Sequence, residues 1–587
     1  MKKNWKILVT NKDRKNIGIL FFVLLLSTFV EMVGISSIPI FAIIITDSSQ
    51  LSNYLPSYIN LDFFLDFEKK KLIFFTSFTL LLIFIFKNLI LTFINYFQAY
   101  TIKHLKINIY QKLFKLYINS NYEFHISQNP SFLIRNITSE VARAANYILN
   151  VLNLIKEFLI MITIFFLLLF VDFKISLLTF SLLSLFSLIF YFLSKKGAKK
   201  RGEIVQVVWA SILKAVNQGI GSVKETKILN KEKYITNLFD KNVNILEKYN
   251  LHQSFMISLP RIFLEIIAIL TIVTVTILFF IFERDESTFI PLISLITVAS
   301  LRLIPSFNTI TSSIARIKYL HPAFRLISQQ IKEASINIQI NKNSSDDIIS
   351  NSSLNFKNKL ELKNIDYFYP NSKKKIIDNL SLEISFGEIV GIIGQSGAGK
   401  STLIDIITGL LIPSKGKVII DGNETNFNEK NWQNQIGYIP QEIYLFDDTI
   451  KANIAFGIDK NEINYEHLDQ AIKLAELDKF INDLPEKENT QVGDRGIKLS
   501  GGQKQRIGIA RSLYFRPKIL IFDEPTSSLD QENENKIMKH IFSLGGDLTI
   551  IIISHKLTTL SKCKKIINIE NGKIKEISNY DTLIKNQ

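Results

Sequence analysis

Cysteine and histidine are scarce in this chain. There is one cysteine, Cys563, in 587 residues, and the seven histidines are scattered without a Cys/His cluster at metal-ligand spacing. A single cysteine excludes an intrachain disulfide framework and fits a reducing compartment. The scattered histidines give no sign of a zinc site. The chain is therefore neither a disulfide-stabilised nor a zinc-stabilised domain.

Polar residues are also few for a soluble protein. Hydrophobic residues make up 47% of the sequence, and the mean hydropathy of +0.19 suggests membrane spans. The length predicts more than one domain. A formal net charge of +16 would suit either nucleic acid or anionic lipid headgroups, so the positions of the charges must decide between them.

Long apolar runs predict the membrane spans. A basic segment, residues 2–16, precedes the first run, which is too long for a cleavable signal peptide. Six runs are long enough to cross a bilayer, and an even number places both termini on one side. The six predicted spans are residues 17–46, 72–97, 148–171, 175–193, 259–282 and 289–310.

The connections between the spans differ in charge. Residues 101–115 and 195–201 (KKGAKKR) are basic, whereas residues 172–174 and 283–286 are short or more acidic. The positive-inside rule therefore places the termini and the two long loops in the cytosol, which also accounts for the net charge without nucleic acid. As helical pairs, these loops would project on the order of 35–40 Å. The outer connection, residues 47–71, fits an amphipathic surface helix and an irregular loop equally well.

The composition changes after the sixth span. A helical pattern continues to about residue 334, an Asn/Ser-rich stretch from 335 to 357 reads as a linker, and residues 358–587 alternate short Ile/Val-rich strands with helices. We predict an α-helical membrane domain of six transmembrane helices with long cytosolic extensions (1–334), joined to an α/β P-loop ATPase domain.

The second domain contains a phosphate-binding loop. An apolar run leads into the nine residues GQSGAGKST, and a helical pattern follows. The glycines let backbone N–H groups approach a phosphate, Lys400 would reach the β- and γ-phosphates, and the Ser401 hydroxyl would hold Mg²⁺. The predicted ATP-binding residues here are Gly394, Gln395, Ser396, Gly397, Ala398, Gly399, Lys400, Ser401 and Thr402.

Two later motifs supply acidic and glycine-rich elements. A buried strand ends in Asp523, predicted to bind Mg²⁺ through water, and Glu524, predicted to be the general base that polarises the attacking water. Ahead of it, Ser500, Gly501, Gly502 and Gln503 begin a helix and form a second anion-binding turn. An ordinary glycine-rich helix N-cap is the alternative reading of that turn.

Three single residues complete the predicted site. Gln441 would sense Mg²⁺ and water from a mobile loop, His555 would contact the γ-phosphate, and Tyr369 would stack on adenine. Each has a plain structural alternative: a surface loop residue, a strand-end cap and a packed aromatic, respectively. The motifs around them favour the catalytic reading.

Together these motifs resemble the nucleotide-binding domain of ABC transporters, and the whole chain is similar to exporter half-transporters. The resemblance implies that Tyr369 is the A-loop aromatic, Gln441 the Q-loop glutamine and His555 the switch histidine. It also implies that LSGGQ (499–503) closes over the phosphate loop of another chain, so we expect a homodimer. Residues 123–124 and 224–225 would lie near coupling helices. Asp494, Pro525 and Lys556 depart from the usual family residues, without removing a catalytic group.

Stretches at 259–265, 301–306 and 436–456 resemble the bacterial flippase for undecaprenyl-pyrophosphate-linked oligosaccharide used in protein N-glycosylation. The resemblance implies a lipid-linked glycan substrate in the inner membrane. Exporters of another lipid, a peptide or a hydrophobic drug are alternatives. The sequence shows no N-terminal Cys/His peptidase domain, which weakens the alternative of a processing peptide exporter. A nucleotide-gated, non-pumping membrane protein is a further alternative, which conflicts with an intact Glu524.

Charges inside the spans are the predicted substrate contacts, because charges in a bilayer are expensive and usually functional. At about 1.5 Å per residue, Lys87 and Arg302 lie roughly 20–23 Å from the outer side. With Arg261, they would meet a pyrophosphate headgroup. The alternatives are that Arg261 pairs with Glu265, that Lys87 snorkels towards the interface and that Arg302 balances Glu31.

Overall fold

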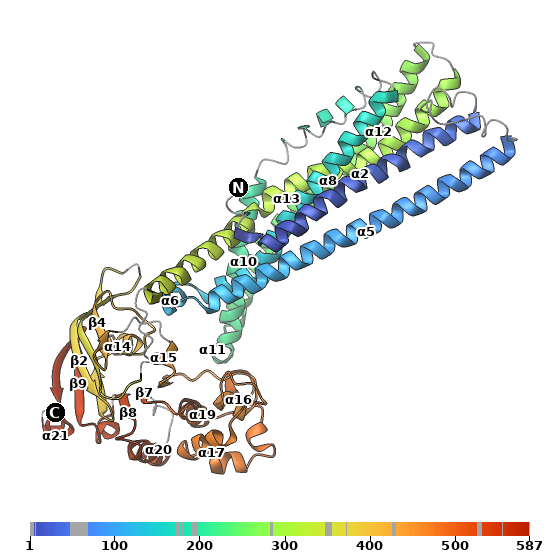
Figure 1. Cartoon of the computed structure of the whole chain (residues 1–587). Helices are drawn as coiled ribbons and strands as arrows, with labels where there is room; N and C mark the ends of the chain where they lie inside the picture. Colours follow the sequence, from blue (N-terminus) through green and yellow to red (C-terminus); the bar gives the residue numbers. More distant parts are fainter. Residues whose placement is uncertain are drawn as a thin grey trace. The chain divides into compact units, whose positions relative to one another are not determined.

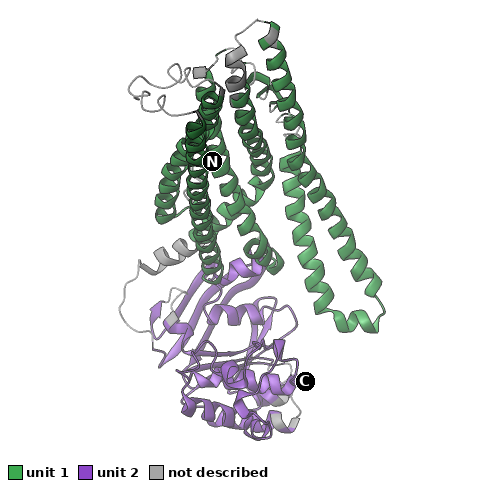
Figure 2. Ribbon diagram, turned by 90° about the vertical axis from the view of Figure 1, so that its right-hand side faces the viewer, with its two compact units in different colours: residues 1–120, 128–336 green, residues 121–127, 337–587 purple. Residues whose placement is uncertain are grey.

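The computed structural model divides into two compact units, coloured separately in Figure 2. Unit 1 contains residues 1–120 and 128–336, and unit 2 contains residues 121–127 and 337–587. The described residues are 5, 7–46, 69–171, 197–281, 286–346, 355–370, 372–424, 430–524, 531–554 and 556–585, with some positions between 172 and 196. The predicted domain limits at 334 and 358 stay predictions, whereas the compact units divide between 336 and 337.

Unit 1 is built from long helices (Figure 1). Its helices are α2 (Asn11–Thr46), α5 (Lys69–Ile118), α7 (Pro130–Arg135), η2 (Asn136–Glu140), α8 (Val141–Val171), α10 (Ala198–Gly221), α11 (Val223–Ile228), α12 (Glu232–Ile281) and α13 (Glu286–Asp346). The short η2 segment is a π-helix between α7 and α8. Helix α10 ends at Gly221 and α12 begins at Glu232, with the short helix α11 between them.

Four of these helical stretches are long and apolar enough to cross a membrane: Asn11–Ile45, Lys70–Ile118, Pro130–Leu169 and Glu232–Ile277. They contain the second predicted span and most of the first, third and fifth. The sixth predicted span lies within α13. About half of the fourth predicted span, residues 175–193, and residues 47–68 of the predicted outer connection 47–71 lie outside the described residues.

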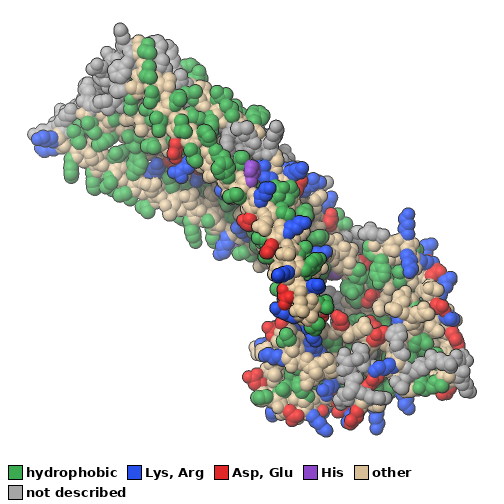
Figure 3. Space-filling model, turned by 180° about the vertical axis from the view of Figure 1, so that it is seen from behind, with side chains coloured by type: hydrophobic (Ala, Val, Ile, Leu, Met, Phe, Trp, Pro, Cys, Tyr) green, Lys and Arg blue, Asp and Glu red, His purple; other side chains and the backbone are tan. Residues whose placement is uncertain are grey.

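The long helices have apolar side chains on both their inner and outer faces. Ile35, Ile160 and Leu303 are almost completely buried in a cluster between the helices. On the outer face, Phe22 and Phe74 are 72% and 78% exposed, and hydrophobic side chains cover much of the helical surface in Figure 3. Because a lipid-facing surface needs no polar residues, this pattern is typical of a membrane domain.

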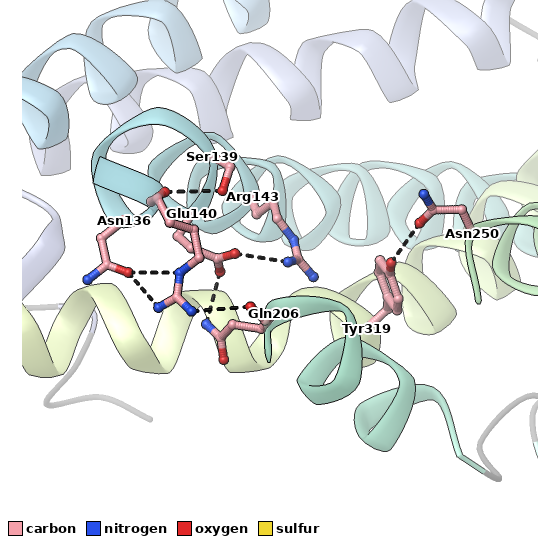
Figure 4. Close-up of polar contacts among 8 residues, drawn as sticks. Asn136, Ser139, Glu140, Arg143, Gln206, Asn250 and Tyr319 are labelled. Atoms are coloured by element: carbon pink, nitrogen blue, oxygen red, sulfur yellow. Dashed lines mark hydrogen bonds and ion pairs between the residues drawn. The ribbon is translucent and has the colours of Figure 1, made fainter. Parts of the chain in front are cut away.

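Polar contacts between buried side chains also cross-link the helices. The Glu140 side chain is fully buried and accepts hydrogen bonds from Arg143 Nη1 and Gln206 Nε2, both at 3.0 Å. Figure 4 shows this carboxylate between η2, α8 and α10, with Tyr319 donating to Asn250 nearby. A buried carboxylate is tolerated only when it is paired in this way. These contacts hold η2, α8 and α10 together.

Unit 2 is an α/β domain. Its strands are β1 (Lys359–Phe368), β2 (Lys375–Ser385), β3 (Ile389–Gly394), β4 (Lys415–Ile420), β5 (Asn423–Glu424), β6 (Ile436–Ile439), β7 (Ile519–Asp523), β8 (Thr549–Ile553), β9 (Lys565–Glu570) and β10 (Lys573–Ser578). Its helices are α6 (Tyr122–Ser127), α14 (Lys400–Ile407), α15 (Lys430–Gln433), α16 (Ile450–Ile454), α17 (Tyr465–Leu474), α18 (Asp478–Asn482), η3 (Lys487–Asn489), η4 (Asp494–Gly496), α19 (Gly501–Tyr514), α20 (Gln531–Ser543), η5 (Leu557–Leu560) and α21 (Tyr580–Lys585).

The strands form two sheets. One has four strands in the order β2-β1-β4-β5, and the other has six in the order β10-β9-β3-β8-β7-β6. In the larger sheet, β9, β3, β8, β7 and β6 run parallel. Alternate residues of β7 enter two different hydrophobic cores, Leu520 one and Ile521 the other. The sheet is therefore buried on both faces, as parallel sheets require.

The parallel strands fix where the functional residues lie. In the register, Asp523 at the end of β7 pairs with Ile553 of β8, and Ile392 of β3 pairs with the same residue. The carboxyl ends of β3, β6, β7 and β8 thus meet at one edge of the sheet, where α/β proteins bind ligands.

Two expectations about the chain's organisation change. The stretch predicted as a linker is helical up to Asp346, because α13 continues without a break into it. Residues 121–127, predicted to be part of the membrane domain, belong to unit 2. Here the Tyr367 hydroxyl donates a hydrogen bond of 3.1 Å to Glu123 in α6. Long-range contacts of this kind leave no local signal in the sequence.

Candidate active site

The glycine-rich loop joins β3 to α14. Its glycines at 394, 397 and 399 all have positive φ, from +79° to +150°. A Cβ on Gly394 would lie 2.3 Å from the Ile569 carbonyl oxygen, whereas one on Gly397 would meet nothing within 4 Å. Side chains would strain this backbone, and α14 begins directly after it with Gly399 as its N-cap. The loop has the shape that a phosphate cradle needs.

Lys400 is held across the loop. Its side chain is buried, and Nζ donates hydrogen bonds to the carbonyl oxygens of Gly394 at 2.8 Å and Gln395 at 3.1 Å. Both acceptors are neutral carbonyl groups of the same loop. The positive charge of Lys400 is preorganised for a phosphate.

Asp523 and Glu524 follow β7 at the carboxyl edge. Glu524 has φ of +48°, a left-handed conformation that is uncommon outside glycine and occurs most often at functional sites. Its side chain accepts a hydrogen bond of 2.9 Å from Gln441 Nε2, which places the predicted Q-loop glutamine beside the predicted base. Two of the three predicted catalytic residues are therefore in contact.

Sequence reasoning missed a tyrosine at this edge. Tyr438 lies on β6, beside β7, and its hydroxyl donates a 3.2 Å hydrogen bond to Asp523 Oδ2. The available signal was its position near the end of a strand adjacent to the acidic pair. Because β6 and β7 are neighbours only in the folded sheet, spacing along the chain could not show the contact.

Burial and neighbouring carboxylates raise the pKa values of acids here. Burial raises the pKa of Asp523, the nearby Glu524 raises it further, and the Tyr438 hydrogen bond and Lys400 oppose this. Burial and then the charge of Asp523 raise the pKa of Asp405, on α14, to about 6. Closely spaced carboxylates with this tendency would be stabilised by a divalent cation.

The predicted adenine-stacking residue lies beside the loop. The Tyr369 hydroxyl is 3.0 Å from Thr402 Oγ1, and its ring meets that of Tyr367 edge-on with centroids 5.2 Å apart. This places Tyr369 next to the start of α14. The structure thus shows the residue near the loop, while adenine stacking itself stays a prediction.

The LSGGQ segment begins α19. The Ser500 backbone N–H donates to Gln503 Oε1 at 2.8 Å, and the Gln503 N–H donates to Ser500 Oγ at 3.3 Å, which is a capping box. The Ser500 side chain is exposed. Within one chain the segment is a well-formed helix N-terminus, so any role towards nucleotide stays a proposal.

The described residues fit ATP and Mg²⁺. Lys400 supplies a cation, the loop supplies backbone N–H groups, and the exposed Ser401 hydroxyl and the Asp523 carboxylate supply the oxygen ligands that Mg²⁺ prefers. No group of three or more His, Cys, Asp or Glu within the described part of the chain could hold a metal alone. His555 lies outside the described residues, as do residues 525–530, which follow Glu524.

The predicted substrate cations are ion-paired within unit 1. Lys87 Nζ lies 3.1 Å from Glu31 Oε2, and Arg302 Nε lies 3.2 Å from Glu31 Oε1. Arg302 Nη2 also lies 3.5 Å from Glu157 Oε2, a partner that the sequence alone did not indicate. This charge cluster, Glu31, Lys87, Glu157 and Arg302, joins α2, α5, α8 and α13 and carries no net charge. The expected unpaired, strongly basic belt is therefore absent among these four residues, because carboxylates from other helices compensate both cations.

Arg261 is not part of the charge cluster. Its Nε donates to Glu265 Oε1 at 3.1 Å, one turn along α12, and its side chain is 72% exposed. The structure therefore realises two of the alternatives left open by the sequence, the Arg261–Glu265 pair and the Arg302–Glu31 pair. Lys87 pairs with Glu31 rather than reaching the interface.

Comparisons with known proteins agree with the fold and the site. Residues 377–527 match the ABC transporter family model. The chain is 28% identical over 501 residues to YgaD of Bacillus subtilis, named as a multidrug export ATP-binding/permease protein, covering 84% of this chain and 83% of that protein. It is 41% identical over 226 residues to HlyB of Escherichia coli O157:H7, an alpha-hemolysin translocation ATP-binding protein, covering 38% of this chain but only 32% of HlyB.

The fold is similar to a solved structure of a bacterial Atm1-family ABC exporter with ATP bound. The TM-score is 0.76 at 20% identity, and the match covers 98% of this chain and 97% of the other. A helical membrane domain fused to an ABC-type ATP-binding domain defines an ABC exporter half-transporter. The chain resembles such half-transporters over most of its length, and its ABC-type ATP-binding domain implies ATP hydrolysis coupled to transport.

Proposed function

We propose that the protein is a homodimeric flippase that moves an undecaprenyl-pyrophosphate-linked oligosaccharide across the bacterial inner membrane, with its ATPase domains in the cytosol. The observation that carries this proposal is the presence of Lys87 and Arg302 between apolar membrane helices. Charges in this setting are costly and usually serve a substrate. Drugs and apolar peptides would not require them.

The ATPase residues divide the work of hydrolysis. Lys400 and the loop N–H groups would bind the β- and γ-phosphates, while Ser401 and Asp523 would hold Mg²⁺, which neutralises developing phosphate charge when bound. Glu524 would accept the proton of the attacking water. Gln441, which donates a hydrogen bond to Glu524, would orient this carboxylate and the water. His555 would contact the γ-phosphate, and Tyr369 would stack on adenine.

A dimer follows from the pairing of motifs. One chain carries one phosphate loop and one LSGGQ segment, and in this family the signature of one ATPase domain closes over the loop of another. Ser500 and its glycines, exposed at the start of α19, would complete the partner's site. Because Lys400, Gln441, Ser500, Glu524 and His555 are all present, both sites of a homodimer would be competent.

The charge cluster shapes how a headgroup would bind. A pyrophosphate meeting Lys87 and Arg302 must compete with Glu31, which already lies within 3.2 Å of both side chains. Binding would therefore exchange an internal anion for the substrate's anion. Arg261, exposed on α12, is paired only with its helical neighbour Glu265 and would be the first cation to meet an entering headgroup.

A multidrug exporter is the second candidate, because YgaD, which matches most of the chain, is named for that role. The toxin-translocation relative HlyB matches only 38% of the chain and says less about the substrate. Export of a hydrophobic drug would depend on the apolar surface of the helices and not on the charge cluster. The two candidates therefore predict different responses to changes in charge.

The test measures ATP-dependent flipping in vesicles that contain a fluorescent undecaprenyl-pyrophosphate oligosaccharide and matched amounts of protein. Wild type should flip the lipid, and the Lys87→Ala/Arg302→Ala double variant should lose most flipping while its basal ATP hydrolysis persists. Glu31→Gln/Lys87→Met, which removes one acid and one base together, controls for unpaired buried charge. Equal flipping by wild type and the Lys87→Ala/Arg302→Ala variant, or drug transport with no lipid flipping, would reject the proposal.

A further inference from the structure

The Asp523 carboxylate has a hydrogen-bond donor that the catalytic motifs do not include. The Tyr438 hydroxyl donates to Asp523 Oδ2 at 3.2 Å, while Gln441 occupies the neighbouring carboxylate, Glu524, at 2.9 Å. The two adjacent acids therefore have separate donors, both from the segment that contains β6. Each carboxylate is oriented by its own neighbour.

The position of Tyr438 is fixed by the sheet. In the register of the parallel pair β6–β7, Tyr438 lies opposite Ile521 and Ile439 lies opposite Phe522. Gly437 packs under this part of β6, where a Cβ would lie 2.9 Å from Leu520. A tyrosine held by strand pairing loses little further freedom when its hydroxyl binds the carboxylate, so the contact can orient Asp523 at small entropic cost.

The chemistry of a phenol favours a donor role for Tyr438. A tyrosine hydroxyl ordinarily carries its proton near neutral pH, and towards an ionised carboxylate it can only donate. The 3.2 Å contact with Oδ2 therefore orients the Asp523 carboxylate.

We propose that Tyr438 is a positioning residue that orients Asp523 for the divalent cation of the ATPase reaction. It acts through Asp523 and does not itself touch the cation or ATP. Hydrogen-bond partners of metal-binding carboxylates commonly set metal affinity in this way. Its distinctive effect is therefore on the affinity for the cation and not on the affinity for nucleotide.

The experiment uses full-length protein in lipid nanodiscs with the Glu524→Gln substitution, so that ATP is not consumed. Binding of Mn²⁺ in the presence of ATP is measured by electron paramagnetic resonance, and ATP affinity is measured separately without metal. Tyr438→Phe keeps the ring and removes the hydroxyl, and it should weaken Mn²⁺ binding about 10-fold with metal-free ATP affinity unchanged. Tyr465→Phe, on the exposed start of α17, is the matched control and should change neither value.

A double-mutant cycle with Asp523→Asn separates the possible outcomes. If Tyr438 acts through Asp523, Tyr438→Phe should have almost no further effect in the Asp523→Asn background. An unchanged Mn²⁺ affinity in Tyr438→Phe, or an equal loss in both backgrounds, would overturn the inference. Because the cation at Asp523 is itself part of the proposed function, an Asp523→Asn variant that still binds Mn²⁺ normally would instead reject that assignment.

Discussion

Lys400 in unit 2 and Lys87 in unit 1 are both shielded from solvent, but their partners differ in charge. Lys400 donates to two neutral carbonyl oxygens of its own loop. Lys87 lies against the Glu31 carboxylate of another helix, which Arg302 shares. A cation held by neutral groups remains available to an anionic ligand, whereas one held by a carboxylate is already neutralised. Burial alone therefore does not identify a ligand-binding cation.

The largest expected effect concerns the ATPase side of this comparison. Glu524→Gln should lower steady ATP hydrolysis by about 100- to 10,000-fold, the usual contribution of a general base. ATP binding should persist, because Lys400 and the loop are unchanged. Phosphate release by purified protein in lipid measures the first quantity, and nucleotide affinity measures the second. A rate within twofold of wild type would show that the assigned base is wrong.

The difference between the two lysines also explains what could be predicted. The partners of Lys400 lie five and six residues away in the same loop, so the motif contains its own geometry. The fold class and the ATPase activity were predicted correctly for this reason. Lys87 and Glu31 lie on separate helices, and Glu157 joins them from a third. Without the packed bundle, the sequence could offer Glu31 only as one alternative.

Tyr438 and α6 show the same limit inside unit 2. Tyr438 is 85 residues from Asp523 along the chain, and Glu123 is 244 residues from Tyr367. Both contacts depend on strand order and on the packing of a helix contributed by a distant part of the sequence. Motif spacing predicts which residues carry the chemistry, and the sheet decides which residues orient them.

The second prediction tests whether the charge cluster is a stabilising network. Glu31→Gln removes the acid shared by Lys87 and Arg302, so that Lys87 loses its carboxylate while Arg302 keeps Glu157. It should lower the free energy of unfolding by about 3–5 kcal/mol, the cost of breaking a shielded ion pair by removing one partner. Thermal unfolding of the purified protein in one detergent measures this. Lys400→Met is the matched comparison, because its partners are neutral, and it should abolish nucleotide binding with a much smaller loss of stability.

Two results would contradict this view of the charge cluster. If Glu31→Gln were as stable as wild type, water or lipid headgroups would already compensate Lys87 and Arg302. If Glu31→Gln/Lys87→Met were no more stable than Glu31→Gln, the Lys87–Glu31 pair would contribute nothing specific. Recovery of stability in the double variant would instead show that the two charges compensate each other across α2 and α5.

The smallest expected effect on stability belongs to Arg261. Its pair with Glu265 spans one helical turn, with side chains 72% and 53% exposed in the protomer. Such pairs contribute about 0.3–0.5 kcal/mol, so Arg261→Gln should unfold at almost the same temperature as wild type. Transport of the pyrophosphate lipid should nevertheless fall, because no carboxylate from another helix neutralises this cation among the described contacts.

Glu265→Gln serves as the control, since it removes the same ion pair but keeps the cation, and it should leave flipping intact. If both variants lost flipping equally, the ion pair and not the Arg261 charge would be responsible. If neither variant lost flipping, the headgroup would have to be bound by Lys87 and Arg302 after it displaced Glu31 from them.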